Sequence, residues 1–207
     1  MPMSKGIYSS LTVEGEAELN AELRRTGIPH SIGDLFHDNT LCRERGPELL
    51  ELFRRPLPFN VRTALAQVVF ARKLKPKQRR EAFTVLMELI KENPEKYNAL
   101  SMLVWNELPD NVDPTKVHEL GQMALDRKYG PLRSGFLMAL KQIRNATAVG
   151  YLLRAARDPL TAAVALDQLA RLRVPGTLQL CEQALTLPGI IHEDALRETR
   201  AKLKRRV

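Results

Sequence analysis

Histidine and cysteine are the side chains whose chemistry would be easiest to recognise in this chain, and their spacing supports neither a metal site nor a nucleophile. Cys42 and Cys181 are too few for a disulfide framework and lack metal-ligand spacing. No H-E-x-x-H motif, G-x-S-x-G elbow, Gly-x-x-x-x-Gly-Lys loop or G-x-G-x-x-G turn occurs. The four histidines stand apart from one another, at His30, His37, His118 and His192. We therefore expect no metal, no cofactor and no small-molecule substrate.

Lysine and arginine give a stronger signal because they are unevenly placed. The 207 residues include 32 Lys+Arg and 24 Asp+Glu, a formal net charge of +8. The stretches 54–80 and 127–157 contain no acidic residue. The first stretch supplies a candidate patch for an anionic partner: Arg72, Lys73, Lys75, Lys77, Arg79 and Arg80. The second stretch supplies a secondary basic patch: Arg133, Lys141, Arg144, Arg154 and Arg157.

Several cations of the first patch crowd the start of a helix that Pro76 is expected to open. Cations at a helix N-terminus oppose the helix dipole by a few tenths of a kcal/mol each when exposed, and Glu81 offsets part of this. A phosphate or an acidic side chain docked there would be stabilised by the cations and by the free N–H groups. Residues 72–80 are therefore a candidate site for an anionic partner, and a solvated turn whose charges serve solubility is the other interpretation.

Helices are the elements expected to position these residues. Leu, Ala, Arg and Glu, all good helix formers, are frequent, and no convincing strand pattern is present. Residues 1–58 predict an irregular helical N-terminal segment that contains a helix over 14–25. Residues 59–207 predict an array of helices, several of them opened by proline. The expected spans are 60–74, 76–92, 94–108, 114–127, 131–144, 147–157, 159–173, 176–187 and 191–204.

The array contains an internal repeat of 29 residues. A shift of that length pairs Leu137 with Leu166, Leu140 with Leu169, Ile143 with Leu172, Arg144 with Arg173, Val149 with Leu178, Leu152 with Cys181 and Ala155 with Ala184. The clearest copies cover 131–158 and 159–187, and 190–207 is expected to be a C-terminal cap. Each copy is a helix, a turn and a second helix. Stacked copies would bury apolar faces that one copy cannot bury alone.

These two copies resemble the HEAT-repeat family, especially its short bacterial type. The resemblance is carried by Ala139-Leu140 and Ile143 followed by Ala148-Val149 and Leu152-Leu153, and by Ala165-Leu166, Leu169 and Leu172 followed by Leu178. It implies an all-α fold, a right-handed α-solenoid of antiparallel helix pairs that binds other macromolecules along its concave surface. It implies no reaction. The alternative architecture is an irregular helical bundle.

One enzyme class on a HEAT-like scaffold remains a third alternative, the DNA glycosylases that repair alkylated bases. That family uses tryptophans and an aspartate, including a Trp-x-x-x-Asp element. The nearest match here runs from Trp105 to Asp110, which is one residue too long, and the chain has no second tryptophan. The departure argues against Asp110 as a catalytic group.

Together these patterns favour a non-catalytic helical-repeat scaffold that binds a protein with an acidic surface, as an adaptor, assembly factor or inhibitor. The alternative is a nucleic-acid-binding module that uses 54–80 and 127–157. The aromatic content of 5% argues against recognition of single strands. The longest apolar run, near 160–166, is far short of the roughly 20 residues of a membrane span, and no signal peptide is recognisable. We expect a cytoplasmic protein that does not bind membranes.

Overall fold

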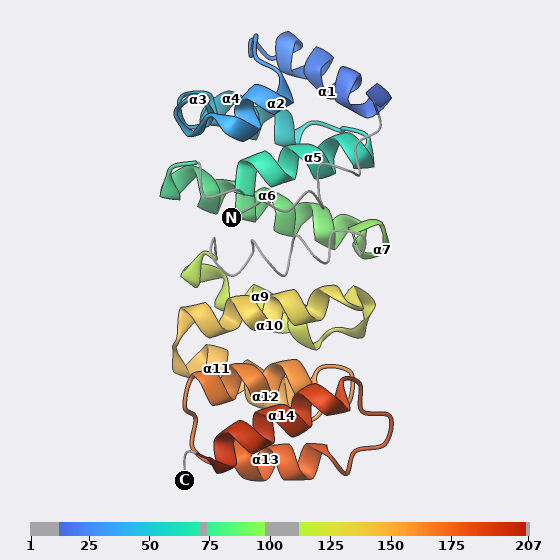
Figure 1. Ribbon diagram of the computed structural model, residues 1–207, viewed down its shortest axis with the longest axis vertical. Helices are drawn as coiled ribbons and strands as arrows, with labels where there is room; N and C mark the ends of the chain where they lie inside the picture. Colours follow the sequence, from blue (N-terminus) through green and yellow to red (C-terminus); the bar gives the residue numbers. More distant parts are fainter. Residues whose placement is uncertain (1–12, 71–73, 98–111, 206–207) are drawn as a thin grey trace. The chain divides into compact units, whose positions relative to one another are not determined.

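The computed structural model describes residues 13–70, 74–97 and 112–205, and these residues form helices, turns and loops without a strand (Figure 1). The expected all-α class is therefore confirmed. The chain divides into two compact units between Leu89 and Ile90. The domain boundary expected after residue 58 falls inside the first of these units.

The first unit contains both long and short helices. Its elements are α1 (Val13–Arg25), α2 (Ile32–His37), α3 (Asn39–Glu44), α4 (Gly46–Arg54), α5 (Phe59–Phe70) and most of α6 (Pro76–Glu92). Ser31 and Asp34 form a capping box at the start of α2, which fixes where that helix begins. Helix α5 contacts α1, α2 and α4, and Phe53 of α4 meets Phe70 of α5 edge to face at 6.0 Å. This aromatic contact helps to form the core of the unit.

The second unit is built from helices that alternate with tight turns. Its elements are α7 (Pro94–Tyr97), η3 (Pro114–Lys116), α9 (Val117–Leu125), η4 (Arg127–Tyr129), α10 (Leu132–Ile143), α11 (Ala146–Ala155), α12 (Ala162–Arg171), α13 (Thr177–Ala184) and α14 (Glu193–Lys204). Helix α10 contacts α9, α11 and α12, while α12 also contacts α11, α13 and α14 (Figure 1). The helix expected over 114–127 is a 3-10 turn followed by α9. Most of the helix expected over 94–108 lies outside the described residues.

Burial within this unit repeats with the 29-residue period. Every residue pair matched by the sequence shift has the same burial in its two copies. Leu137 and Leu166 are fully buried, as are Leu152 and Cys181, whereas Arg144 and Arg173 are both exposed. The two copies therefore use equivalent positions for core and for surface.

Candidate partner-binding surfaces

The first candidate surface is the start of α6, which we call the α6 basic turn and define as Lys75, Lys77, Arg79 and Arg80. Arg79 is half-buried and the other three are exposed. The first turn of α6 contains no acidic residue. None of the four cations forms an ion pair with a carboxylate of the described residues. Their charge is therefore not neutralised within the described part of the chain.

Contacts of Gln78 and Gly46 hold the α6 basic turn in place. The Oε1 atom of Gln78 accepts a hydrogen bond from the Lys75 backbone N–H at 2.9 Å, which is one half of a capping box. Gly46, at the start of α4, is buried, and a Cβ added there would meet the Gln78 amide group at 2.2–2.7 Å. The absence of a side chain at Gly46 leaves room for the Gln78 amide group beside α4. Gln78 therefore caps the first turn of α6 and lies against the start of α4. The two remaining members of the first predicted patch, Arg72 and Lys73, lie outside the described residues.

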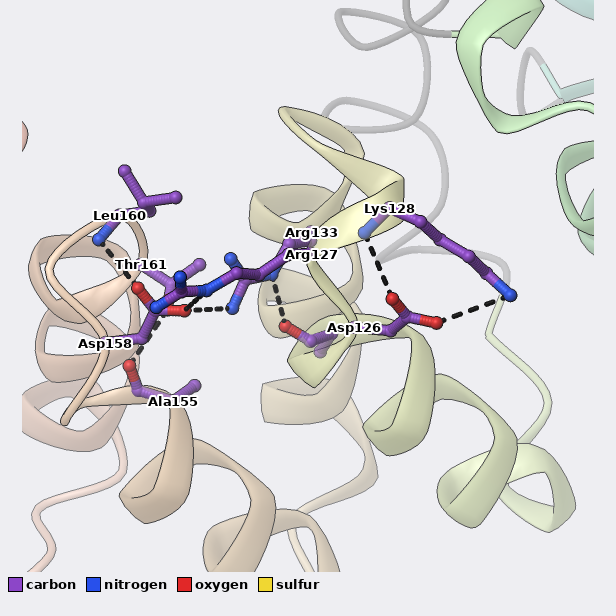
Figure 2. A network of polar contacts seen from close by, with 9 residues as sticks. Asp126, Arg127, Lys128, Arg133, Ala155, Asp158, Leu160 and Thr161 are labelled. Carbon is purple, nitrogen blue, oxygen red and sulfur yellow. Dashed lines mark hydrogen bonds and ion pairs between the residues drawn. The ribbon is translucent and has the colours of Figure 1, made fainter.

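The secondary basic patch needs one correction, because Arg133 lies in the interior. Its side chain is 2% exposed, and its Nη2 atom donates to Asp158 Oδ2 at 2.7 Å (Figure 2). Its Nε atom donates to the carbonyl oxygen of Ala124 at 2.9 Å. Arg127 adds a longer contact of 3.6 Å to the same carboxylate oxygen. Arg133 therefore stabilises the fold and is not part of a surface for a partner.

Asp158 is the acceptor at the centre of this network. Burial acts to raise the pKa of its carboxyl group, but the hydrogen bonds from Arg133 and from the Leu160 backbone N–H outweigh it, so that the pKa lies below its ordinary value. The backbone carbonyl of Asp158 also accepts the N–H groups of Thr161 and Ala162, at 3.0 and 2.8 Å. The residue thus joins α10 to the turn that precedes α12.

The remaining members of the secondary patch lie in different surroundings. Lys141 and Arg144 line one cavity at the end of α10. Arg154 and Arg157 are exposed, and the Arg154 guanidinium lies 5.7 Å from the centre of the Tyr151 ring. The Tyr151 contact is a cation–π geometry that occupies one face of the Arg154 side chain.

Two cationic residues absent from the predicted sites share the cavity of Lys141 and Arg144. They are Arg171 and Arg173, from the end of α12 and the residues that follow it. The signal that could have identified one of them was present in the sequence, because the 29-residue shift pairs Arg144 with Arg173. The sequence could not show that α10 packs against α12, which brings Arg144 and Arg173 to the same cavity.

The histidines and cysteines do not assemble a reactive centre in the described part of the chain. His30 and His37 line one open hollow, yet no group of three or more His, Cys, Asp or Glu able to hold a metal is found among the described residues. His118 Nδ1 lies 3.3 Å from the Tyr151 hydroxyl group. Cys42 and Cys181 are both fully buried, and burial raises the pKa of the Cys181 thiol to about 11. A thiol with such a pKa is a poor nucleophile near neutral pH.

Trp105 and Asp110, the residues of the glycosylase alternative, lie outside the described residues. Among the helices that the structure describes, none is both long enough and apolar enough to cross a membrane.

Comparison of the chain with models of known protein families, with curated proteins and with solved structures gave no match.

Proposed function

We propose that this protein is a non-catalytic helical-repeat scaffold of the HEAT type, which binds a protein with an acidic surface. In this proposal helix pairs stack as an α-solenoid, and the bound protein is held by cations on the scaffold surface. The protein would act as an adaptor, an assembly factor or an inhibitor in the cytoplasm. Two buried cysteines, too few for a disulfide framework, are consistent with a reducing compartment.

The repeat supports the scaffold part of the proposal. Copies with equivalent core and surface positions are the expected signature of an array in which each unit packs on its neighbours. Helix α12 has the neighbours this arrangement requires, since it contacts α10 and α11 of the preceding copy, α13 of its own copy and α14 beyond it. The interaction of α12 with helices on both sides favours a stacked array over isolated hairpins.

The observation that carries the binding part is the α6 basic turn. Its four cations have no carboxylate partner among the described residues, while the surface acid Glu119 pairs with both Lys91 and Lys116. Four unneutralised charges at a helix N-terminus destabilise the free protein slightly. An acidic partner surface would remove this cost on binding, and its complementary charge would also speed association.

Affinity purification of the native protein, with and without nuclease, tests this proposal. We expect an acidic protein to co-purify in both conditions, and to be lost from the variant in which Lys75, Lys77, Arg79 and Arg80 are replaced by Gln. The control variant replaces four other exposed cations by Gln, giving the same change in net charge: Arg24, Arg25, Arg54 and Arg205. Equal loss of the partner from both variants would show that only net charge matters. Retention by the first variant would refute the role of the α6 basic turn.

Nucleic-acid binding is the second candidate, and the same unpaired cations favour it. A sequence pI near 9.7 and phosphate contacts without stacking aromatics are compatible with binding to a duplex backbone. Titration of a labelled DNA or RNA duplex at increasing salt separates the two functions. Affinity at physiological salt that falls steeply with salt, and that depends on the α6 basic turn, would favour nucleic acid. The glycosylase alternative requires that the parent protein releases a base and that the substitution Asp110→Asn abolishes this release.

A further inference from the structure

The cavity between the ends of α10 and α12 is a concentrated cationic site in the second unit. It has a volume of about 360 Å³ and lies where α10 and α12 end and α11 begins. Four of its lining residues are cationic, and we call these the basic cleft: Lys141, Arg144, Arg171 and Arg173. The rest of the lining is apolar, from Val149, Leu172 and Val174. Clefts that combine charges of one sign with apolar walls concentrate the electrostatic potential.

Most of the charge in the basic cleft is not neutralised by the protein itself. Arg171 pairs with Asp167 on the same helix at 2.8 Å. Lys141, Arg144 and Arg173 form no ion pair with any carboxylate among the described residues. No acidic residue lines the cavity. Three of the four cations are therefore available to a ligand.

The backbone at two of these arginines is unfavourable for any residue other than glycine. Arg144 has φ 54° and Arg173 has φ 57°, both in the left-handed region. Arg173 occupies the glycine position of a Schellman motif, with hydrogen bonds from Arg173 N to Ala170 O and from Val174 N to Leu169 O. The same motif after α1 uses Gly27, with φ 84°. Arginine at a position suited to glycine costs stability, and residues held in such conformations are found preferentially at functional sites.

The basic cleft continues into a second, less polar groove. Lys141 and Arg171 also line a cavity of about 440 Å³ that extends over α10, α12 and α14. Met138, Val164 and Ala195 are among the residues that line this groove. Its acidic residues pair with cations of the same groove, Asp167 with Arg171 and Glu198 with Lys202. The charges of the groove are thus largely balanced, whereas those of the basic cleft are not.

We propose that the basic cleft binds the carboxylates of an acidic segment of the partner protein, while apolar side chains adjacent in that segment occupy the groove. This inference rests on the proposed function and names where a partner of that kind would be held. Arg144 and Arg173 supply planar guanidinium groups, which bind a carboxylate with two parallel hydrogen bonds. Lys141 and Arg171 lie at the junction of the two cavities and contact the segment as it enters the groove.

The distribution of charge favours an acidic peptide segment over a nucleic acid. A nucleic-acid backbone carries a negative charge at every nucleotide and needs cations along its whole path. Beyond the basic cleft the groove offers apolar atoms and cations already paired with Asp167 and Glu198. A short run of carboxylates next to apolar residues matches this arrangement.

The test uses fluorescein-labelled hexaglutamate as the probe, with its affinity for the full chain measured by fluorescence anisotropy at about 50 mM salt, where surface charges are incompletely screened. The key variant is Arg144→Gly with Arg173→Gly. Glycine removes both charges but suits the left-handed backbone, so the variant should fold with an unchanged or raised melting temperature. We expect its affinity to fall about tenfold, equivalent to about 1.4 kcal/mol. The charge-preserving variant, Arg144→Lys with Arg173→Lys, should lose less affinity than the glycine variant, because it keeps the charge and loses only the paired guanidinium hydrogen bonds.

The matched control removes the same net charge outside the cleft, by Arg157→Gln with Arg205→Gln, and should leave binding of the probe nearly unchanged. Equal weakening by the control and the glycine variant would overturn the proposal in favour of net charge. Binding that depends on the α6 basic turn alone would overturn the cleft but preserve the proposed function. Failure of the probe to bind would also overturn the cleft, and co-purification of an acidic protein would still decide the proposed function. If a duplex DNA bound the same residues more tightly than hexaglutamate does, the acidic segment would be overturned as the ligand and nucleic acid would be assigned to the cleft.

Discussion

The substitution Asp158→Asn is expected to destabilise the second unit strongly, because it leaves the guanidinium group of Arg133 buried without its counter-charge. The Arg133 side chain is 2% exposed and that of Asp158 is 16% exposed, and they are joined at 2.7 Å (Figure 2). Asparagine keeps the shape of aspartate and can still accept the Leu160 N–H at Oδ1, but its NH2 group then replaces the oxygen that accepts from Arg133. The substitution therefore removes both the charge and the hydrogen bond that Arg133 donates.

The magnitude follows from the burial of the pair. Removal of one partner of a buried ion pair costs about 3–5 kcal/mol, since the remaining charge is desolvated and uncompensated. The hydrogen bond from Arg133 to the Ala124 carbonyl oxygen remains. We therefore expect the free energy of unfolding to fall by about 3 kcal/mol, the lower end of that range. A nearby surface pair provides the comparison: Lys128 and Asp126 lie 3.3 Å apart with side chains 57% and 44% exposed. Solvent screens such an exposed pair, so Lys128→Gln should cost far less than Asp158→Asn.

Urea unfolding followed by far-UV circular dichroism gives the free energies of unfolding for the parent, Asp158→Asn and Lys128→Gln. The double variant Arg133→Met with Asp158→Asn completes the design, because it replaces the orphaned guanidinium by an apolar side chain. We expect the double variant to be more stable than Asp158→Asn alone. If Asp158→Asn cost no more than Lys128→Gln, or if the double variant were the least stable, the reasoning from burial would be refuted.

The remaining predictions concern acid stability, helix packing and thiol reactivity. Because the pKa of Asp158 is lowered in the folded protein, its contribution is complete above about pH 4 and is lost as the pH falls further, so the stability difference from Asp158→Asn should shrink in urea titrations below about pH 4. Gly121→Ala should destabilise by about 1–2 kcal/mol, since the new Cβ would meet the Tyr151 ring at 2.3 Å, whereas Gly150→Ala, with no atom within 4 Å, should stabilise by about 0.5–1 kcal/mol in the same assay. Cys42 and Cys181 should react with Ellman's reagent at about pH 8 only after denaturation, and rapid reaction in the native state would contradict their burial.

Local signals in the sequence were sufficient for α6 and for most helices of the second unit. The proline at position 76 and the helical spacing of the apolar residues after it predicted α6 with the bounds that the structure gives, Pro76–Glu92. The helix expected over 131–144 corresponds to α10 (Leu132–Ile143). These predictions succeed because a helix start depends on capping and on proline within a few residues, and the apolar face depends on a period of 3.6 residues.

Burial of charged residues was not predictable in the same way. The sequence predicts Arg133 in a basic surface patch, because residues 127–157 contain no acidic residue. Its counter-charge, Asp158, lies 25 residues away and meets it only after α10 and the turn before α12 have packed. A count of charges along the chain cannot detect such a pair.

The sequence by itself therefore determined the all-α class, the positions of the helices and a 29-residue period, because each depends on neighbouring residues or on a repeated pattern. Only the tertiary structure decided which cations face a ligand. It placed Arg133 in the interior with Asp158, and it brought Lys141 and Arg144 to the same cavity as Arg171 and Arg173. The physical reason is that the charge of a side chain belongs to its residue, whereas its burial and its partners depend on residues that are distant in the chain.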